Sequence, residues 1–163
     1  MKKNNVLFLT HAAMIAALYV VLTFLSNAFG LASGAIQIRI SEALTLLPYF
    51  TPAAVPGLFV GCLLSNVLTG CALFDVLFGS LATLLGAIGT RIIRKSKWLT
   101  PIPPIVSNMI IVPLVLTYVY ELPGGIPYLM LTVGIGEIIS CGVLGMILLF
   151  SLQKYASRIF TIS

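Results

Sequence analysis

Apolar residues fill six stretches of the chain, and short polar, glycine-containing or proline-containing breaks separate them. The stretches cover about residues 6–28, 35–50, 52–68, 73–93, 103–120 and 127–153. Most of them approach the roughly 20 mainly apolar residues that a helix needs to cross the hydrocarbon layer of a bilayer. The pattern therefore predicts an all-α fold, an integral membrane bundle of about six transmembrane helices that forms a single transmembrane domain over residues 1–163.

The second stretch, residues 35–50, is the weakest of these helices, because it is short and carries Arg39 and Glu42. The positive charges support it nevertheless. With six crossings, one side of the membrane collects eight of the nine basic residues: Lys2, Lys3, Arg91, Arg94, Lys95, Lys97, Lys154 and Arg158. Only Arg39 remains on the other side. Since cytoplasmic loops carry the excess of Lys and Arg, we expect both termini in the cytoplasm.

The composition excludes an ordinary soluble domain. Hydrophobic residues make up 60% of the chain and charged residues 8%, whereas soluble domains have roughly 25% charged residues. The net charge of +5 then indicates orientation in a membrane and not binding to nucleic acid. No glycine-rich phosphate loop followed by Lys and Ser or Thr occurs, so any ATP hydrolysis has to come from a partner. Three cysteines without metal-binding spacing, Cys62, Cys71 and Cys141, are expected to be small buried side chains.

Charged and amide side chains inside the apolar stretches are the candidates for ligand binding. A charge near the bilayer centre costs roughly 2.5–3.5 kcal/mol on insertion scales, so such a residue normally faces the bundle interior. Glu137 lies next to Gly136, and Gly134 lies three residues before it, which allows a ligand or a helix to approach the carboxylate closely. Its alternative role is an internal ion pair, for instance with Arg39. The residues predicted to bind substrate are Glu137, Arg39, Glu42, Asn66, Asp75 and Asn108.

Each of the other candidates also has a structural alternative. Arg39 and Glu42 are three residues apart and could pair on one helix face. Asp75 begins a helix, where an acidic side chain also gains from the helix dipole. Asn66 and Asn108 could serve only hydrogen bonds between helices. Because the topology brings most of these side chains to the outer half of the bundle, an outward-facing polar pocket explains them together.

Catalytic chemistry is not expected. His11 lies near the predicted cytoplasmic start of the first helix and has no serine or carboxylate at a useful spacing. The four acidic residues lack the HxxE or paired-Asp spacing of membrane metalloenzymes. We therefore expect no catalytic residue, no metal site and no cofactor.

Two ridges of small residues lie side by side on the first helix. Ala12 stacks over Ala16, and Ala13 stacks over Ala17. Such small-xxx-small patterns let another helix approach closely in lipid. All four alanines are predicted to bind a partner, and packing inside the bundle is an equally weighted alternative.

Several ordered motifs give the chain a family resemblance. The sequences RISEAL (residues 39–44), LPYFTPAAVPGLF (47–59), GCLLSN (61–66) and DVLFGSLATL (75–84), with the later Gly136-Glu137, resemble the QueT-type family of queuosine-precursor transporters. The resemblance covers about residues 10 to 150. Members of this family are substrate-binding (S) subunits of energy-coupling factor (ECF) transporters.

The resemblance implies a multi-pass protein of the cell membrane, not an enzyme, that captures a small molecule on the outer face. It also implies partners for ATP-driven import, namely a transmembrane T subunit and two ATPase subunits. Small residues of helix one dock on the T subunit in such proteins, and Ala12, Ala13, Ala16 and Ala17 match that pattern. The implied substrate is a 7-deazaguanine base.

Two other functions remain open from the sequence. The protein could be an S subunit for another vitamin-like substrate, because one scaffold can host different ligands. It could also be a structural or assembly membrane protein whose polar residues only hold helices together.

Overall fold

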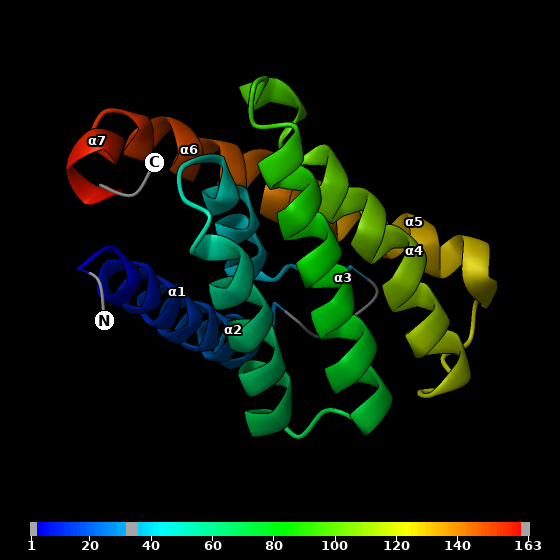
Figure 1. Ribbon diagram of the computed structural model, residues 1–163. Helices are drawn as coiled ribbons and strands as arrows, with labels where there is room; N and C mark the ends of the chain where they lie inside the picture. The colour runs from blue at the N-terminus through cyan, green and yellow to red at the C-terminus, as the bar shows by residue number, and fades with distance from the viewer. Residues whose placement is uncertain (1–2, 32–35, 161–163) are drawn as a thin grey trace.

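Helices are the regular secondary structure of the described part of the computed structural model, which covers residues 3–31 and 36–160 (Figure 1). Lys2 and Ala35, the predicted start of the second segment, lie outside these residues. The elements are α1 (Lys3–Ala28), the 3-10 helix η1 (Ile40–Tyr49), α2 (Ala54–Leu68), α3 (Leu73–Ile92), the 3-10 helix η2 (Lys97–Leu99), α4 (Ile102–Tyr118), α5 (Gly125–Glu137), the π-helix η3 (Ile138–Gly145), α6 (Met146–Gln153) and α7 (Ala156–Ile159). Since α5, η3 and α6 follow one another without a break, they form one long helix. The predicted all-α class is confirmed.

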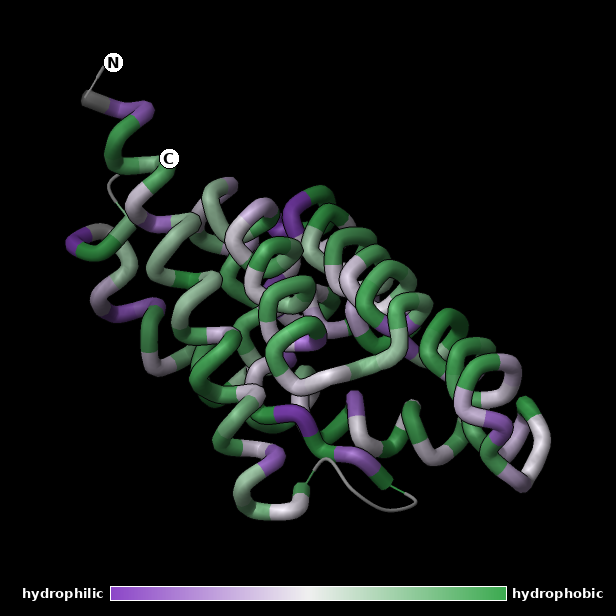
Figure 2. The backbone as a smooth tube through the Cα atoms, turned by 90° about the horizontal axis from the view of Figure 1, so that it is seen from below, coloured by the Kyte–Doolittle hydropathy of each residue, from purple (hydrophilic) through white to green (hydrophobic). Residues whose placement is uncertain are grey.

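Within the described residues, four helical stretches are long and apolar enough to cross a membrane. They are Asn4–Ala28, Leu73–Ile92, Lys97–Tyr118 and Gly125–Gln153. The helices in the second and third predicted segments are shorter, with 10 residues in η1 and 15 in α2. Large apolar side chains are exposed on the outside of the bundle, such as Leu73 and Ile92, and hydrophobic positions dominate the helices in Figure 2. This surface suits a hydrocarbon environment.

The second segment differs from a regular membrane-spanning helix. Its helix η1 is of the 3-10 type, contains Pro48 and is buried from Ser41 to Pro48. At about 2.0 Å per residue, such a helix spans about 20 Å, which is less than the roughly 30 Å of the hydrocarbon layer. It packs against α1, α2, α3, α6 and η3 instead of lipid. Glu42, one of the charged residues that make this segment a poor membrane-spanning helix, is therefore enclosed by other helices of the bundle.

The bundle has two distinct ends. Loops 69–72 and 119–124 lie at one end, called here the pocket end (Figure 1). The start of α1 and α7 lie at the opposite end, called here the terminal end, where the rings of His11 and Phe160 are 6.0 Å apart. The connection between α3 and α4, with its basic residues, is also at the terminal end. That both termini are cytoplasmic stays a prediction.

The two alanine ridges of α1 have different environments. Ala12 and Ala16 are buried and face two glycines of α2. A Cβ atom added to Gly57 would lie 2.7 Å from the Ala12 carbonyl oxygen, and one added to Gly61 would lie 3.0 Å from the Ala16 Cα. Ala12 and Ala16 are thus committed to packing inside the bundle, and the partner-binding prediction narrows to the exposed Ala13 and Ala17.

The close contact between α1 and α2 generates a first prediction. Gly61→Ala should lower the free energy of unfolding by about 1–3 kcal/mol, because overpacking forces the two backbones apart. The added Cβ would lie only 2.8 Å from the Tyr19 Cβ. Denaturant unfolding of the purified protein in detergent measures the change. Gly142→Ala is the control, since the nearest atom to its Cβ is 3.7 Å away. Equal stability of both variants would contradict the tight α1–α2 packing.

Candidate functional site

A polar cavity of about 270 Å³ lies at the pocket end. Its walls come from α1, residues 37–39, α2, loop 69–72, α3, α4 and the loop that follows α4. The lining residues are Thr23, Ser26, Asn27, Gln37, Arg39, Asn66, Thr69, Cys71, Asp75, Leu116, Tyr120 and Leu122. The volume is just below the roughly 300–1,000 Å³ of typical ligand pockets, so the cavity suits a small molecule. Three predicted substrate-binding residues, Arg39, Asn66 and Asp75, line it.

The Asp75 carboxylate is held from one side of this cavity. Tyr120 donates its hydroxyl to Asp75 Oδ2 over 3.1 Å and accepts the backbone N–H of Ala72 over 3.1 Å. Asn66 Nδ2 lies 3.5 Å from the Asp75 backbone oxygen. The N-terminus of α3 receives no side-chain cap. Asp75 lies in the first turn of α3, so its carboxylate can gain from the helix dipole while it also contacts Tyr120.

Arg39 comes from the segment that precedes η1. Its backbone N–H donates to Ser140 Oγ over 3.2 Å, and the next N–H, of Ile40, donates to Ser26 Oγ over 2.9 Å. A Cβ at Gly136 would collide with the backbone oxygen of Gln37, so only glycine lets this segment lie so close to α5. These contacts fix the backbone that carries the Arg39 side chain.

Arg39 and Asp75 bring opposite charges to the cavity without forming a direct ion pair. Within residues 3–31 and 36–160, the Arg39 guanidinium is beyond ion-pair distance of Glu42, Asp75 and Glu137, but its positive charge attracts all three carboxylates. Neither the Arg39–Glu42 pair nor the Arg39–Glu137 pair, both alternatives from the sequence, is formed there. Arg39 and Asp75 thus present opposite charges to one small cavity, an arrangement that can bind a ligand with both acceptors and donors.

The remaining three candidates lie deeper, in a group we call the inner cluster: Tyr19, Glu42, Asn108, Glu137 and Cys141. Glu42 is 2% exposed, Asn108 3% and Glu137 7%. Glu42 accepts the Tyr19 hydroxyl at Oε1 and Asn108 Nδ2 at Oε2, the latter over 3.4 Å. The inner cluster therefore draws its residues from α1, η1, α4, α5 and η3.

Glu137 is linked to the same cluster through a cysteine. Cys141 donates its thiol towards Glu137 Oε2 over 3.2 Å, and its sulfur also lies 3.4 Å from the Glu42 backbone oxygen. Ligand atoms of Glu42, Glu137 and Cys141 all lie within 4.8 Å of one another. Such a set could hold a metal ion, which the sequence spacing did not indicate. Two buried carboxyl groups with uncharged donors around them also favour a ligand that brings donors or positive charge.

Three functional candidates were missed by the sequence analysis. Tyr19 and Tyr120 contact Glu42 and Asp75 across 23 and 45 residues of sequence, and no local pattern indicates such pairs. Cys141 could have been predicted from the sequence, because it follows Glu137 by four residues and thus lies on the same helix face.

Comparison with known proteins assigns this membrane bundle with a small polar pocket to a class of transport proteins. A family model described as QueT transporter matches residues 9–154. The protein named Queuosine precursor transporter QueT, from Lactococcus lactis subsp. cremoris, is 35% identical over 85 residues, which are 52% of this chain and 50% of that protein. The aligned part thus spans about half the length of this curated relative. No solved structure matches the chain.

The chain belongs to the QueT transporter family, as its motifs predicted. It is a multi-pass membrane protein.

Proposed function

We propose that the protein is the substrate-binding S subunit of an ECF transporter and captures a queuosine precursor, a 7-deazaguanine base, for ATP-driven import. The observation that carries this proposal is the small polar cavity lined by the oppositely charged Arg39 and Asp75 in a chain of the QueT transporter family. The name of the Lactococcus relative, Queuosine precursor transporter QueT, supports the choice of substrate. A role in binding and transport does not require a catalytic residue.

The chemistry of the base matches the candidate residues. A 7-deazaguanine presents its ring N–H and exocyclic NH2 as adjacent donors, which one carboxylate accepts as a fork. Glu137 or Glu42 fits this role, and Arg39, Asn66 or Asn108 can donate to the carbonyl oxygen of the base. Arg39 links the two groups of candidates, since it lines the cavity and its charge acts on Glu42. The base then lies between the cavity and the inner cluster.

The distribution of basic residues supports the orientation of the protein in the membrane. The lack of a phosphate-binding motif in the sequence supports an external source of energy. The excess of basic residues at the terminal end favours a cytoplasmic location for that end, and the pocket end would then face outward. The sequence has no phosphate-binding loop, and we infer that a T subunit and two ATPase subunits supply ATP hydrolysis. The exposed Ala13 and Ala17 form the surface on which the T subunit packs.

Transport should depend on ATP hydrolysed by other chains. In liposomes, uptake of the base is expected only when the T subunit and both ATPases are reconstituted with this protein. Binding to the isolated protein should raise its melting temperature in detergent, because a ligand that binds only the folded state stabilises it. Accumulation by this chain alone, driven by a proton or sodium gradient and indifferent to ATP, would refute the S-subunit mechanism. The absence of stabilisation by any 7-deazaguanine would refute the substrate.

Glu137→Gln should weaken binding of the base by about ten- to a hundredfold, because a charged hydrogen-bond acceptor is worth about 1.5–3 kcal/mol. The substitution keeps the shape of the side chain and replaces one acceptor oxygen by a donor. Isothermal titration calorimetry of the purified protein measures the affinity. Glu121→Gln, in the exposed loop 119–124, is the matched control and should bind normally. A folded Glu137→Gln variant with unchanged affinity would remove Glu137 from the site.

Ala13→Trp and Ala17→Trp should abolish complex formation with the T subunit and ATP-dependent uptake, because bulk on this ridge prevents close helix approach. Binding of the base to the isolated variants should persist, since both side chains lie away from the pocket end. Ala28→Trp is the control, as it is an exposed alanine at the other end of α1. Co-purification with the T subunit checks the result. Normal assembly of both ridge variants would show that another surface docks.

A further inference from the structure

Positive charge is concentrated at the connection between α3 and α4. Arg91 lies in the last turn of α3, and Arg94, Lys95 and Lys97 follow within the next six residues. Arg94 and Lys95 are exposed. The charge of Arg94 acts on Arg91, and like charges so close together disfavour each other. A negatively charged ligand at this connection would relieve the repulsion.

The chain itself supplies no acidic partner for these charges. Its four acidic residues all lie within the described part of the structure: Glu42, Asp75, Glu121 and Glu137. Two of them belong to the pocket end and two to the inner cluster. Arg91 donates to an uncharged group, the backbone oxygen of Pro48, over 3.1 Å. Any negative partner for the three basic residues that follow it therefore comes from outside the chain.

Hydrogen bonds and ring contacts hold the connection in place on the bundle. Thr90 donates to the backbone oxygen of Thr100 over 2.9 Å, and Thr100 donates to the backbone oxygen of Lys97 over 2.6 Å. Lys97 Nζ lies 5.0 Å from the centre of the Phe150 ring of α6, and the ring of Trp98 lies 5.4 Å from the same ring. An ammonium held over a ring still has N–H groups for an oxygen acceptor. Lys97 is thus positioned before any ligand binds.

Exposed apolar side chains lie directly beside the basic ones in the sequence. Ile92, Trp98 and Leu99 are exposed, Trp98 to 67%. The connection also joins two helical stretches that are long and apolar enough to cross a membrane. Tryptophan is enriched at the level of the lipid head groups. The connection therefore has the composition of a surface where lipid phosphates and acyl chains meet.

An anionic phospholipid matches both the charge and the apolar surface. Its phosphate oxygens accept hydrogen bonds from Arg and Lys, and basic clusters at the ends of membrane-spanning helices bind such head groups. Its acyl chains can cover Ile92 and Trp98. An acidic protein segment would match the charges alone and leave these apolar side chains without a matching partner surface.

We propose that the α3–α4 connection is a binding site for the head group of an anionic phospholipid, with Arg94, Lys95 and Lys97 as the phosphate-binding residues. The site lies at the terminal end, away from the polar cavity. The inference depends neither on the substrate nor on the ATPase partners, so it holds or fails separately from the proposed function.

The test measures which lipid the purified full chain retains in detergent doped with equal amounts of phosphatidylglycerol and phosphatidylcholine, by native mass spectrometry. The wild-type protein should prefer phosphatidylglycerol by about ten- to a hundredfold, because each basic residue near an anionic lipid adds about fivefold in affinity. Lys97→Gln should reduce this preference about three- to tenfold. The triple variant Arg94→Gln, Lys95→Gln and Lys97→Gln should remove it. Retention of phosphatidylcholine should not change, which also verifies that the variants are folded.

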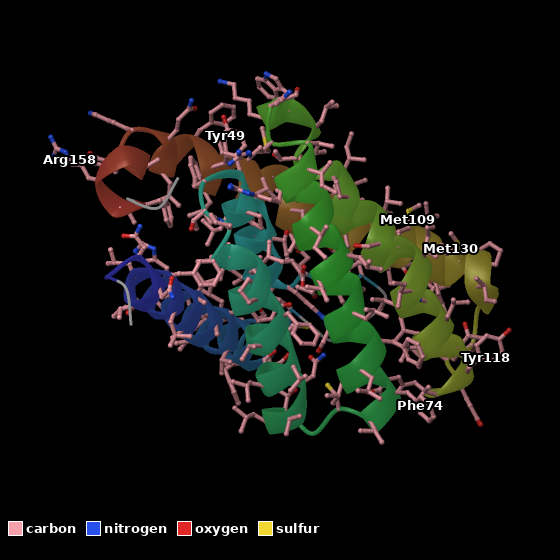
Figure 3. All side chains as sticks on the ribbon, in the orientation of Figure 1. Tyr49, Phe74, Met109, Tyr118, Met130 and Arg158 are labelled. Atoms are coloured by element: carbon pink, nitrogen blue, oxygen red, sulfur yellow. The ribbon has the colours of Figure 1, made fainter. Side chains whose placement is uncertain are left out.

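Arg158→Gln is the matched control, because it removes one exposed positive charge from the same end of the bundle. Arg158 belongs to α7, and Figure 3 shows it at the side of the molecule, away from the α3–α4 connection at the top. This variant should keep the wild-type preference. Equal retention of both lipids by the wild-type protein overturns the inference, and so does an equal loss of preference in Arg158→Gln and Lys97→Gln. If the triple variant keeps its lipid preference but no longer assembles with the ATPase subunits, an acidic protein surface is the partner and the inference is wrong.

Discussion

Polar groups inside this bundle must find protein partners, because the hydrocarbon around it offers none. The need for hydrogen-bond partners is greatest in η1, because every residue from Ser41 to Pro48 is buried. Its partners come from several helices: Thr23 of α1 donates to Ser41, Asn108 of α4 donates to Glu42, and Thr45 contacts Cys141 of η3. The element that is least able to span the membrane thus organises the others, and the positions of the site residues follow from its hydrogen bonds.

One face of α1 packs inside the bundle, and the other face is exposed and free for contacts with a partner. The face with Ala12, Ala16 and Tyr19 is buried and meets the glycines of α2 and the carboxylate of Glu42. The face with Ala13 and Ala17 is exposed. Because one helix carries both faces, a partner that packs on α1 contacts an element that also reaches the inner cluster.

Much of the fold could be predicted from the sequence, and less of the site. Hydrophobic stretches indicate helices because a lipid-facing helix must be apolar over its length, which explains the agreement for α1, α3 and α4. The same rule cannot identify η1 as a 3-10 helix, since its polarity reflects enclosure by other helices. Glu137 and Asp75 could be chosen as candidates from the sequence, because burying a charged side chain in an apolar stretch costs free energy. Their separation into a cavity and an inner cluster depends on tertiary contacts of Tyr19 and Tyr120, which no periodicity encodes.

The π-helix η3 has a consequence for the direction of the Glu137 carboxylate. Residues 138–145 interrupt one long helix between Glu137, which belongs to the site, and α6, which packs in the core through Leu149. In a continuous α-helix, inserting or deleting one residue rotates everything beyond it by about 100°, given 3.6 residues per turn. A wider π turn can absorb such a change locally. The π turn thus sets the rotation of the half that carries Glu137 relative to the half that packs through Leu149, so the direction of the Glu137 carboxylate depends on a change of helix type and not only on the packing of α6.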